Sequence, residues 1–450
     1  MTLKELKIGK TAVITAVGGD GALRQHFLDM GVIPGAEVTV MQYAPLGDPM
    51  ELRIHGYELT LRLADADKIE IKEIAVSKNA TEESKNGRRR VRSGHPGLGE
   101  GGKYHEKTTE QPLPEGTLLT FALAGNQNCG KTTLFNQLTG ANQRVGNFPG
   151  VTVDRKSGSI KGYTNTEITD LPGIYSLSPY TTEEIIARDY IINEKPDVLI
   201  NIIDATNIER NLYLTLQIFE TNIPTVIALN MMDEVEARGT KINISKLSKE
   251  LGVKIVPIVA RSGKGIKELM DAAIEVGSKD NDEEVSISSD GTKAVSLGLS
   301  VFSSEIEGYI EDICSKLNKN EDMSVWKAIK ILEEDEIVIG SLSANDKIEI
   351  QDTLSKANTE FNDDIESAIA DQRYKFISSV VNKCVTKSKS NGVKREETKS
   401  DKIDKILTNR FLAIPLFLVI MYLLFSITFS EKFVLFEFAR IIEYSFTFLE

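Results

Sequence analysis

Hydrophobic and polar positions change their rhythm several times along the chain, and each change marks a candidate domain. Residues 1–76 carry five short, partly alternating runs that are rich in β-forming residues and separated by turns such as "GGDG" and "PLGDP". This pattern is typical of half-buried strands. Together with one helix, "ALRQHFLDMG", which ends on Gly31, it predicts a small β-barrel. The five runs are "TAVITAV", "AEVTVMQYA", "MELRIHG", "YELTLRL" and "KIEIKEI".

Residues 117–277 alternate strand-like and helix-like patterns. The strand-like runs are strongly apolar, which favours strands that are covered on both faces. Helical stretches alternate with them, and this succession predicts an α/β domain around a parallel sheet. The apolar runs are "LLTFALA", "DVLINIID", "PTVIALN" and "VKIVPIVA", and the helical stretches include "KTTLFNQLTG", "ERNLYLTLQIFETN" and "ISKLSKELG".

Residues 278–390 have a helical pattern of their own. After a polar start, apolar positions recur at steps of three and four among many charges, which predicts a helical domain. Its single tryptophan, Trp326, is interpreted as a core anchor. Two polar stretches complete this part of the chain: residues 77–116 predict a flexible linker, and residues 391–410 predict a polar connector.

Residues 411–430 break the soluble pattern. The segment from Phe411 to Phe429 is uncharged and almost wholly apolar, and at ~1.5 Å per residue it nearly spans a hydrocarbon core of ~30 Å. We therefore expect a transmembrane helix, with a buried helix of a soluble domain as the alternative. Basic residues precede it closely, so the positive-inside rule places residues 1–410 on the cytoplasmic side. Residues 431–450 are expected to begin an incomplete membrane region or to form an amphipathic interfacial helix.

The net charge and the few cysteines limit the kinds of ligand and partner that the chain is expected to bind. The net charge of −13 argues against nucleic acid as the main partner, because binding to its phosphates needs clustered Lys and Arg. The linker run "RRRVR" could bind acidic lipid or nucleic acid, but a solvated charge run is the simpler interpretation. Cys129, Cys314 and Cys384 are far apart and give no disulfide or zinc pattern, which fits a reducing cytosol. The start "MTLKELKIGKTAV" lacks the apolar stretch of a signal peptide.

One short stretch carries a specific chemical pattern. Gly125–Thr132, "GNQNCGKT", matches G-x-x-x-x-G-K-[ST] between an apolar run and a helical one. Its glycines permit a tight loop whose backbone N–H groups converge on a polyphosphate at the start of the next helix. Lys131 places a charge beside the β- and γ-phosphates, and the Thr132 hydroxyl ligates Mg²⁺. The predicted nucleotide contacts in this loop are Gly125, Asn126, Gln127, Asn128, Cys129, Gly130, Lys131, Thr132 and Thr133.

A second stretch, "DLPG", follows the strand-like "TEIT". Asp170 is suited to hold Mg²⁺ through water, and Gly173 to offer its N–H to a γ-phosphate. Upstream, "NFPGVTVD" contains Thr152, a candidate switch threonine that reaches Mg²⁺ only when the γ-phosphate is present. The predicted Mg²⁺ ligands are Thr132, Thr152 and Asp170, the predicted catalytic residues are Lys131, Thr152 and Gly173, and Leu171 and Pro172 join the nucleotide contacts.

A third stretch, "NMMD", follows the strand-like "PTVIAL" and predicts the base. A fixed carboxylate at Asp233 accepts hydrogen bonds from guanine N1–H and the 2-amino group, and adenine offers no such pair. The pattern therefore predicts GTP rather than ATP. Further along, "VARSGKG" stands where a second base-contacting loop is expected. Ala260 is the best single candidate in it for a contact with the base, through its backbone. The predicted base contacts are Asn230, Met231, Asp233, Val259, Ala260 and Arg261.

Together these motifs look like a small GTPase domain, and the set resembles one family, the bacterial ferrous-iron transport protein B. The resemblance runs from about Thr117 to Phe429 and is carried by "GNQNCGKTTLFNQLTGANQRVGNFPGVTVDRKSG", "DLPGIYSLSPYTTEEIIARDY", "DATNIERNLYLTLQI" and "ALNMMDE". Residues 1–76 contain "LRQHFLDMGVIPGAEVTV" and "LTLRLADADKIEI". They resemble the small protein A of the same system, which is SH3-like in the family and is fused here.

The resemblance implies a GTP-binding and GTP-hydrolysing cytosolic part of a ferrous-iron (Fe²⁺) uptake transporter in the bacterial inner membrane. Its GTP–GDP cycle would couple through the helical domain to the remaining permease segment, which we expect to be missing from this sequence. The sequence leaves open whether the chain forms a homo-oligomer. The family also implies K⁺ beside Asn128 in addition to Mg²⁺. Hydrolysis is expected to be slow, because Ile174 stands where many GTPases place a water-orienting Gln.

The sequence also permits other interpretations. A membrane-tethered regulatory GTPase that moves no ion is the alternative from another class of protein. An ATP-driven transporter subunit is a further one, which "NMMD" disfavours. Cys129 stands where the family often has Ser, and it either has a lowered thiol pKa at the helix N-terminus or simply packs.

Overall fold

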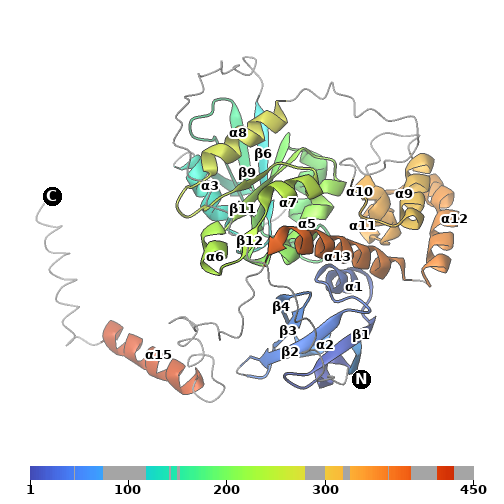
Figure 1. Ribbon diagram of the computed structural model, residues 1–450, viewed down its shortest axis with the longest axis horizontal. Helices are drawn as coiled ribbons and strands as arrows, with labels where there is room; N and C mark the ends of the chain where they lie inside the picture. Colours follow the sequence, from blue (N-terminus) through green and yellow to red (C-terminus); the bar gives the residue numbers. More distant parts are fainter. Residues whose placement is uncertain are drawn as a thin grey trace, which may run out of the picture.

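The computed structural model contains three packed domains and a C-terminal helix (Figure 1). They are the N-terminal β domain (residues 1–73), the P-loop domain (118–278), the helical domain (299–386) and helix α15. The described residues are 1–44, 46–73, 118–140, 143–148, 153–278, 299–317, 325–362, 364–386 and 413–429. The predicted linker at 77–116, the predicted connector at 391–410 and the segment 431–450 lie outside these ranges.

The N-terminal β domain has the five strands and the helix that its sequence predicts. The strands form one antiparallel sheet in the order β4-β3-β2-β1-β5. In β4, buried and exposed positions alternate strictly, so one face of the strand supplies the core. Its elements are η1 (Leu3–Glu5), β1 (Thr11–Val17), α1 (Gly21–Asp29), β2 (Glu37–Tyr43), β3 (Met50–Ile54), β4 (Tyr57–Leu61), α2 (Leu63–Ala66) and β5 (Ile69–Glu73).

The P-loop domain is built on a seven-stranded sheet in the order β13-β11-β10-β6-β9-β8-β7. Its strands are β6 (Leu119–Gly125), β7 (Gln143–Asn147), β8 (Asp154–Gly158), β9 (Thr166–Asp170), β10 (Val198–Asp204), β11 (Thr225–Asn230) and β13 (Ile255–Pro257). From β13 to β9 the neighbours are parallel, as predicted, but β8 and β7 run antiparallel.

The prediction of a parallel sheet is therefore wrong for one edge, and the sheet is mixed. The physical reason is the length of the connections. Only residues 148–153 separate β7 from β8, and only residues 159–165 separate β8 from β9. A parallel pair needs a crossover of about a dozen residues or more, so these short connections produce antiparallel neighbours.

Helices cover both faces of this sheet, which explains the apolar strands (Figure 1). Helices α3 and α8 pack on one face with the side chains of Phe121 and Ile200, while α5 and α7 pack on the other with Ile203 and Leu229. The remaining elements of the domain are α3 (Lys131–Thr139), α4 (Thr182–Asp189), η2 (Tyr190–Glu194), η3 (Ala205–Asn207), α5 (Ile208–Glu220), α6 (Met232–Ala237), β12 (Lys241–Ile242), α7 (Ile244–Leu251) and α8 (Ile266–Gly277).

The helical domain contains α9 (Ser304–Leu317), α10 (Val325–Leu332), α11 (Glu336–Ser341), α12 (Ala344–Glu360) and α13 (Ile365–Cys384). Trp326 is only 2% exposed and lies in the core of this domain, as its interpretation as an anchor predicts. After α13 the short strand β14 (Val385–Thr386) pairs antiparallel with β12 of the P-loop domain. One apolar core runs without interruption from the N-terminal β domain into α5 and α13.

Helix α15 (Ala413–Phe429) lies within the predicted transmembrane segment 411–430. In the part of the chain that the structure describes, no helix is both long and apolar enough to cross a membrane. The transmembrane helix therefore stays a prediction.

Candidate nucleotide-binding site

The P-loop forms the turn that its glycines predict. Strand β6 ends at Gly125 and helix α3 begins at Lys131. The backbone is left-handed at Asn128 and at Gly130, with φ of 63° and 99°. At Gly125 (φ 154°) an added Cβ would lie 2.4 Å from the carbonyl oxygen of Ile202, so glycine is required there. The loop thus leads directly into a helix N-terminus, the arrangement that binds phosphate.

Lys131 lies back over this loop. Its ammonium group donates hydrogen bonds to the carbonyl oxygens of Gly125 (3.0 Å) and Asn126 (3.1 Å), and the residue is 8% exposed. An added Cβ on Gly173 would lie 2.9 Å from Lys131 Nζ and 3.0 Å from Gln127 Cγ. The structure therefore brings the "DLPG" loop against the P-loop, as the sequence predicts for a γ-phosphate site.

Asp170 ends β9 beside the same loop, and its environment fits a metal site. Its Oδ1 is buried and has no hydrogen-bond partner among the residues that the structure describes. Burial raises the pKa of this carboxyl, while the charges of Lys131 and Lys156 and a hydrogen bond from Thr132 lower it. A carboxylate oxygen of this kind, next to a threonine hydroxyl, suits Mg²⁺, which prefers hard oxygen ligands and completes its shell with phosphates and water. Thr152 lies outside the described residues.

At the other end of the site, Asn230 joins two loops. Its Nδ2 donates to the carbonyl oxygen of Cys129 (2.8 Å), and its Oδ1 accepts from the N–H of Ala260 (2.9 Å). The predicted base motif, the P-loop and the "VARSGKG" loop are thus brought together. Asp233 is exposed in the first turn of α6, which begins after a left-handed Met231.

The other predicted residues fall into two groups. Gln127, Asn128, Thr132, Thr133 and Arg261 are exposed, while Asn126, Cys129, Leu171, Val259 and Ala260 are buried or partly buried. Both amide atoms of Asn126 are buried, and neither has a hydrogen-bond partner in the described part of the chain. Burial raises the pKa of the Cys129 thiol, and the residue is 1% exposed, which favours packing over an activated thiolate.

The segment after Gly173 is anchored in ways that the sequence reasoning missed. The N–H of Ile174 donates to the carbonyl oxygen of Gly125 (3.3 Å), and the N–H of Leu177 donates to Gln217 Oε1 (2.7 Å). Lys330 of the helical domain donates to the Ser178 hydroxyl (3.1 Å). The sequence does carry a signal for Gln217, which is a polar residue inside the apolar run "LYLTLQIF".

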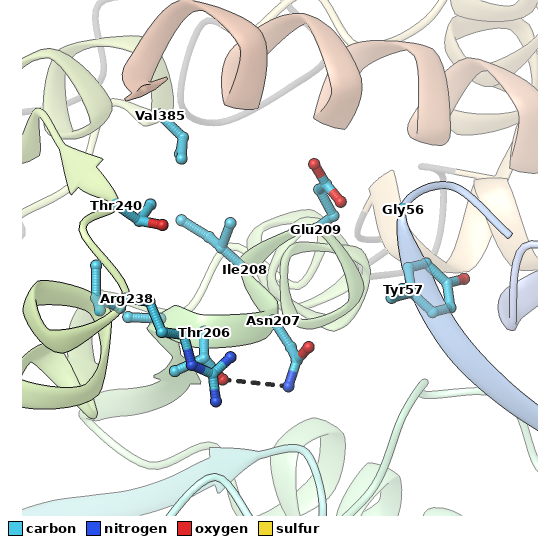
Figure 2. Close-up of a pocket in the computed structure, with 11 residues that line it drawn as sticks. Gly56, Tyr57, Thr206, Asn207, Ile208, Glu209, Arg238, Thr240 and Val385 are labelled. Carbon is cyan, nitrogen blue, oxygen red and sulfur yellow. Dashed lines mark hydrogen bonds between the residues drawn. The ribbon is translucent and has the colours of Figure 1, made fainter. Parts of the chain in front are cut away.

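A small cavity lies at the junction of the domains rather than at the P-loop (Figure 2). Gly56 and Tyr57 of the N-terminal β domain border it on one side, and the start of α5 borders it on the other. Asn207 donates a 3.3 Å hydrogen bond to the Thr206 hydroxyl at its edge. None of the predicted nucleotide contacts lines it. The remaining lining residues are Ala205, Ile208, Glu209, Val235, Arg238, Thr240 and Val385.

Sequence profiles of three protein domains match this chain in the order of its structural domains. A FeoA domain matches residues 1–73, ferrous iron transport protein B matches residues 119–273, and the FeoB cytosolic helical domain matches residues 302–386. The matched ranges correspond closely to the three domains of the structure.

Individual relatives agree with these profiles. A fusion of Fe(2+) transport protein A with the Fe(2+) transporter FeoB, from Porphyromonas gingivalis, is 38% identical over 95% of this chain and 52% of its own length. A GDP-bound mutant of the S. thermophilus FeoB G-domain is 42% identical over 60% of this chain and all of its own, with a TM-score of 0.54. The mGMPPNP-bound NFeoB from S. thermophilus is 41% identical over 59% and 97%, with a TM-score of 0.51. The chain spans 52% of the length of the Porphyromonas gingivalis fusion protein and 38% of the length of the Fe(2+) transporter FeoB from Salmonella typhi.

Proposed function

This chain belongs to the FeoB family, and we propose that its P-loop domain binds GTP with Mg²⁺ and hydrolyses it to GDP and phosphate. The observation that carries this proposal is the convergence of three loops: Lys131 and Gly173 meet at one end of the site, and Asn230 ties the base motif to the P-loop at the other. The S. thermophilus relatives, which carry GDP or mGMPPNP, support it.

Catalysis would rest on positioning and on charge. In the described conformation the Lys131 ammonium contacts two loop carbonyls, and on nucleotide binding it would turn to the β- and γ-phosphate oxygens. The N–H of Gly173 would stabilise charge that develops on the γ-phosphate. Thr132 and Asp170, with Thr152 as the predicted switch residue, would hold Mg²⁺, which neutralises phosphate charge when bound.

The same residues set the rate and the choice of base. Ile174 is 1% exposed and its side chain is apolar, so it cannot orient an attacking water molecule. Unassisted hydrolysis would therefore be slow. Asp233 is exposed beside Met231 and is available to accept from guanine, which favours GTP over ATP. K⁺ beside Asn128 would supply positive charge where other GTPases use an arginine.

In the full-length protein we propose that this cycle drives Fe²⁺ uptake across the bacterial inner membrane. Residues 411–430 would cross the membrane, with residues 1–410 in the cytoplasm, and the signal would pass through the helical domain. The contact between Lys330 and Ser178 supports this route, because it joins the helical domain to the segment after Gly173.

The direct test measures GTP turnover and nucleotide affinity for the wild-type chain and for Lys131→Ala. We expect the variant to lose GTP binding by a factor of about 100 or more, since it removes a charge from a buried phosphate site. Lys267→Ala, on the exposed face of α8, is the matched control. Equal affinity in both variants would refute the nucleotide site. Iron uptake by cells with the full gene, with and without Lys131→Ala, tests the transport role.

A further inference from the structure

Arg210 lies at a point where two domains meet the catalytic edge of the sheet. It is the third residue of α5, which follows the end of β10. Strand β10 pairs in parallel with β6, with Ile202 opposite Gly125. Because the carboxyl ends of parallel strands meet at one edge, the start of α5 and the P-loop share that edge.

The guanidinium of Arg210 contacts two tyrosine rings from different domains. Its Cζ is 4.2 Å from the ring centroid of Tyr175, in the P-loop domain, and 5.8 Å from that of Tyr57, in the N-terminal β domain. Both distances are within the range of cation–π attraction, and the planar, weakly hydrated guanidinium is suited to it. Within the described ranges no hydrogen bond or ion pair of Arg210 competes with these two contacts.

Tyr175 stands two residues after Gly173, on a segment with little freedom. On one side, the N–H of Ile174 is bound to the P-loop carbonyl of Gly125 at 3.3 Å. On the other, the N–H of Leu177 is bound to Gln217 of α5 at 2.7 Å. A displacement of the Tyr175 ring would therefore be transmitted to Gly173, whose N–H we assign to the γ-phosphate.

Tyr57, the second ring that Arg210 contacts, is held in place by the N-terminal β domain and by α13. It is 5% exposed, and its hydroxyl donates to the carbonyl oxygen of Met30 (2.6 Å) and lies 3.2 Å from the hydroxyl of Tyr374 on α13. The N-terminal β domain also touches the segment after Gly173 a second time. The ring of His26 stacks on that of Tyr180, with centroids 4.1 Å apart and planes 17° apart.

We propose that Arg210 is a positioning residue for GTP hydrolysis. It holds Tyr175, and through it the loop that carries Gly173, in place against a ring of the N-terminal β domain. The docked N-terminal β domain thereby becomes part of the catalytic unit. This inference rests on the proposed function of the P-loop domain.

Nucleotides with and without a γ-phosphate should respond differently to the loss of the Arg210 contact. Only a nucleotide with a γ-phosphate uses Gly173, so loss of the Arg210 contact weakens binding of GTP or GMPPNP and lowers kcat, while GDP affinity is unchanged. A general structural role would weaken the binding of all three nucleotides together. The ratio of GMPPNP affinity to GDP affinity therefore separates positioning from folding.

The experiment uses the full 450-residue chain in detergent, with kcat, KM and the affinities for GMPPNP and GDP measured for each variant. For Arg210→Ala we expect kcat to fall roughly threefold to tenfold, the scale of a partly buried cation–π contact, with GDP affinity within about twofold of wild type. Tyr175→Leu and Tyr57→Leu should reproduce the effect, whereas Tyr175→Phe and Tyr57→Phe, which keep the ring, should retain most of the activity. Arg210→Lys should recover part of it.

Arg53→Ala, at an exposed surface pair with Glu58, is the matched control and should match wild type. The double variant Arg210→Ala with Tyr175→Leu should have a kcat no lower than that of Arg210→Ala alone, because both substitutions remove the same Arg210–Tyr175 contact. The inference would be overturned if Arg210→Ala had the same kcat as the wild type, or if it lost GMPPNP affinity and GDP affinity equally. Absence of GTP turnover in the wild-type chain would instead refute the proposed function.

Discussion

Asn230 and Cys129 are 101 residues apart in the chain, yet the Asn230 amide donates a 2.8 Å hydrogen bond to the Cys129 carbonyl oxygen. The other atom of the same amide accepts from the N–H of Ala260 at 2.9 Å. All three groups are buried. One side chain thus satisfies two backbone groups of two different loops, and it fixes the P-loop relative to the base motif.

Asn230→Ala should therefore weaken the binding of GTP and of GDP to a similar degree. It leaves a buried carbonyl and a buried N–H without partners, which costs about 1–3 kcal/mol for each group. We expect GTP and GDP affinities both to fall by about tenfold or more, together with a lower Tm. Asn345→Ala, at an exposed position in the first turn of α12, is the control and should change neither quantity. A selective loss of GTP affinity with normal GDP affinity would contradict this role of Asn230.

The carboxylate of Asp233 gives a second test, of base choice. Asp233→Asn replaces an acceptor by an amide that also donates, which suits the 2-oxo group of xanthine. We expect GTP affinity to fall by about tenfold to a hundredfold, and XTP to bind at least as well as GTP. Glu234→Gln, an exposed neighbour that pairs with Arg238 at the surface, should keep the preference for GTP. Competition with ATP, GTP and XTP measures the effect, and an unchanged order would refute the assignment of Asp233.

The P-loop could be predicted from sequence because its information is local. Gly125, Gly130 and Lys131 fix both the turn and its chemistry within eight residues. The central strands could also be predicted, because burial on both faces leaves an apolar run in each of them. Strands β7 and β8 could not. "QRVGN" is mostly exposed, "DRKSG" is mostly half-buried, and neither carries an apolar run or an alternation of apolar and polar residues.

The contacts between domains could not be predicted, because they depend on pairs far apart in sequence. Arg373 binds Glu220 and Glu333 inside the protein with none of its side chain exposed, yet the sequence shows only a charged helix there. Likewise, "NIERN" does not reveal that Arg210 contacts rings of two domains. Such pairs become visible only when the packing of the helices is known.

Asn128 gives a third prediction, for the dependence on monovalent cations. It is exposed in the P-loop with φ of 63°, a conformation that glycine also adopts without strain. Asn128→Gly therefore removes the side-chain oxygen without distorting the loop. We expect wild-type turnover to be roughly tenfold faster in K⁺ than in Na⁺, about 1.4 kcal/mol of barrier, and Asn128→Gly to lose the difference. Equal wild-type rates in the two salts would remove K⁺ from the proposed mechanism.

The Glu184 carboxyl, in the first turn of α4, predicts a dependence of stability on pH. The residue is 2% exposed, and its carboxylate accepts from the N–H of Thr181 (3.0 Å). Burial raises the pKa of Glu184 to about 7, helped by the charge of Asp29 in the N-terminal β domain, while the hydrogen bonds with Thr181 lower it. In the unfolded chain the group ionises near its ordinary value of 4.5.

Between these two pH values the folded protein holds a proton that the unfolded chain has released. Stability linked to Glu184 is therefore complete below about pH 4.5 and is lost as the pH rises through about 7. Glu184→Gln can still accept from Thr181 but does not titrate, so it should be more stable than wild type at pH 8, by up to about 3 kcal/mol. The difference should fall below about 1 kcal/mol at pH 5 and vanish only near pH 4. Thermal unfolding of both proteins between pH 5 and pH 8 measures it, with exposed Glu183→Gln as the control. A difference between wild type and Glu184→Gln that stays constant across this range would mean that the carboxyl is ionised in the folded protein throughout.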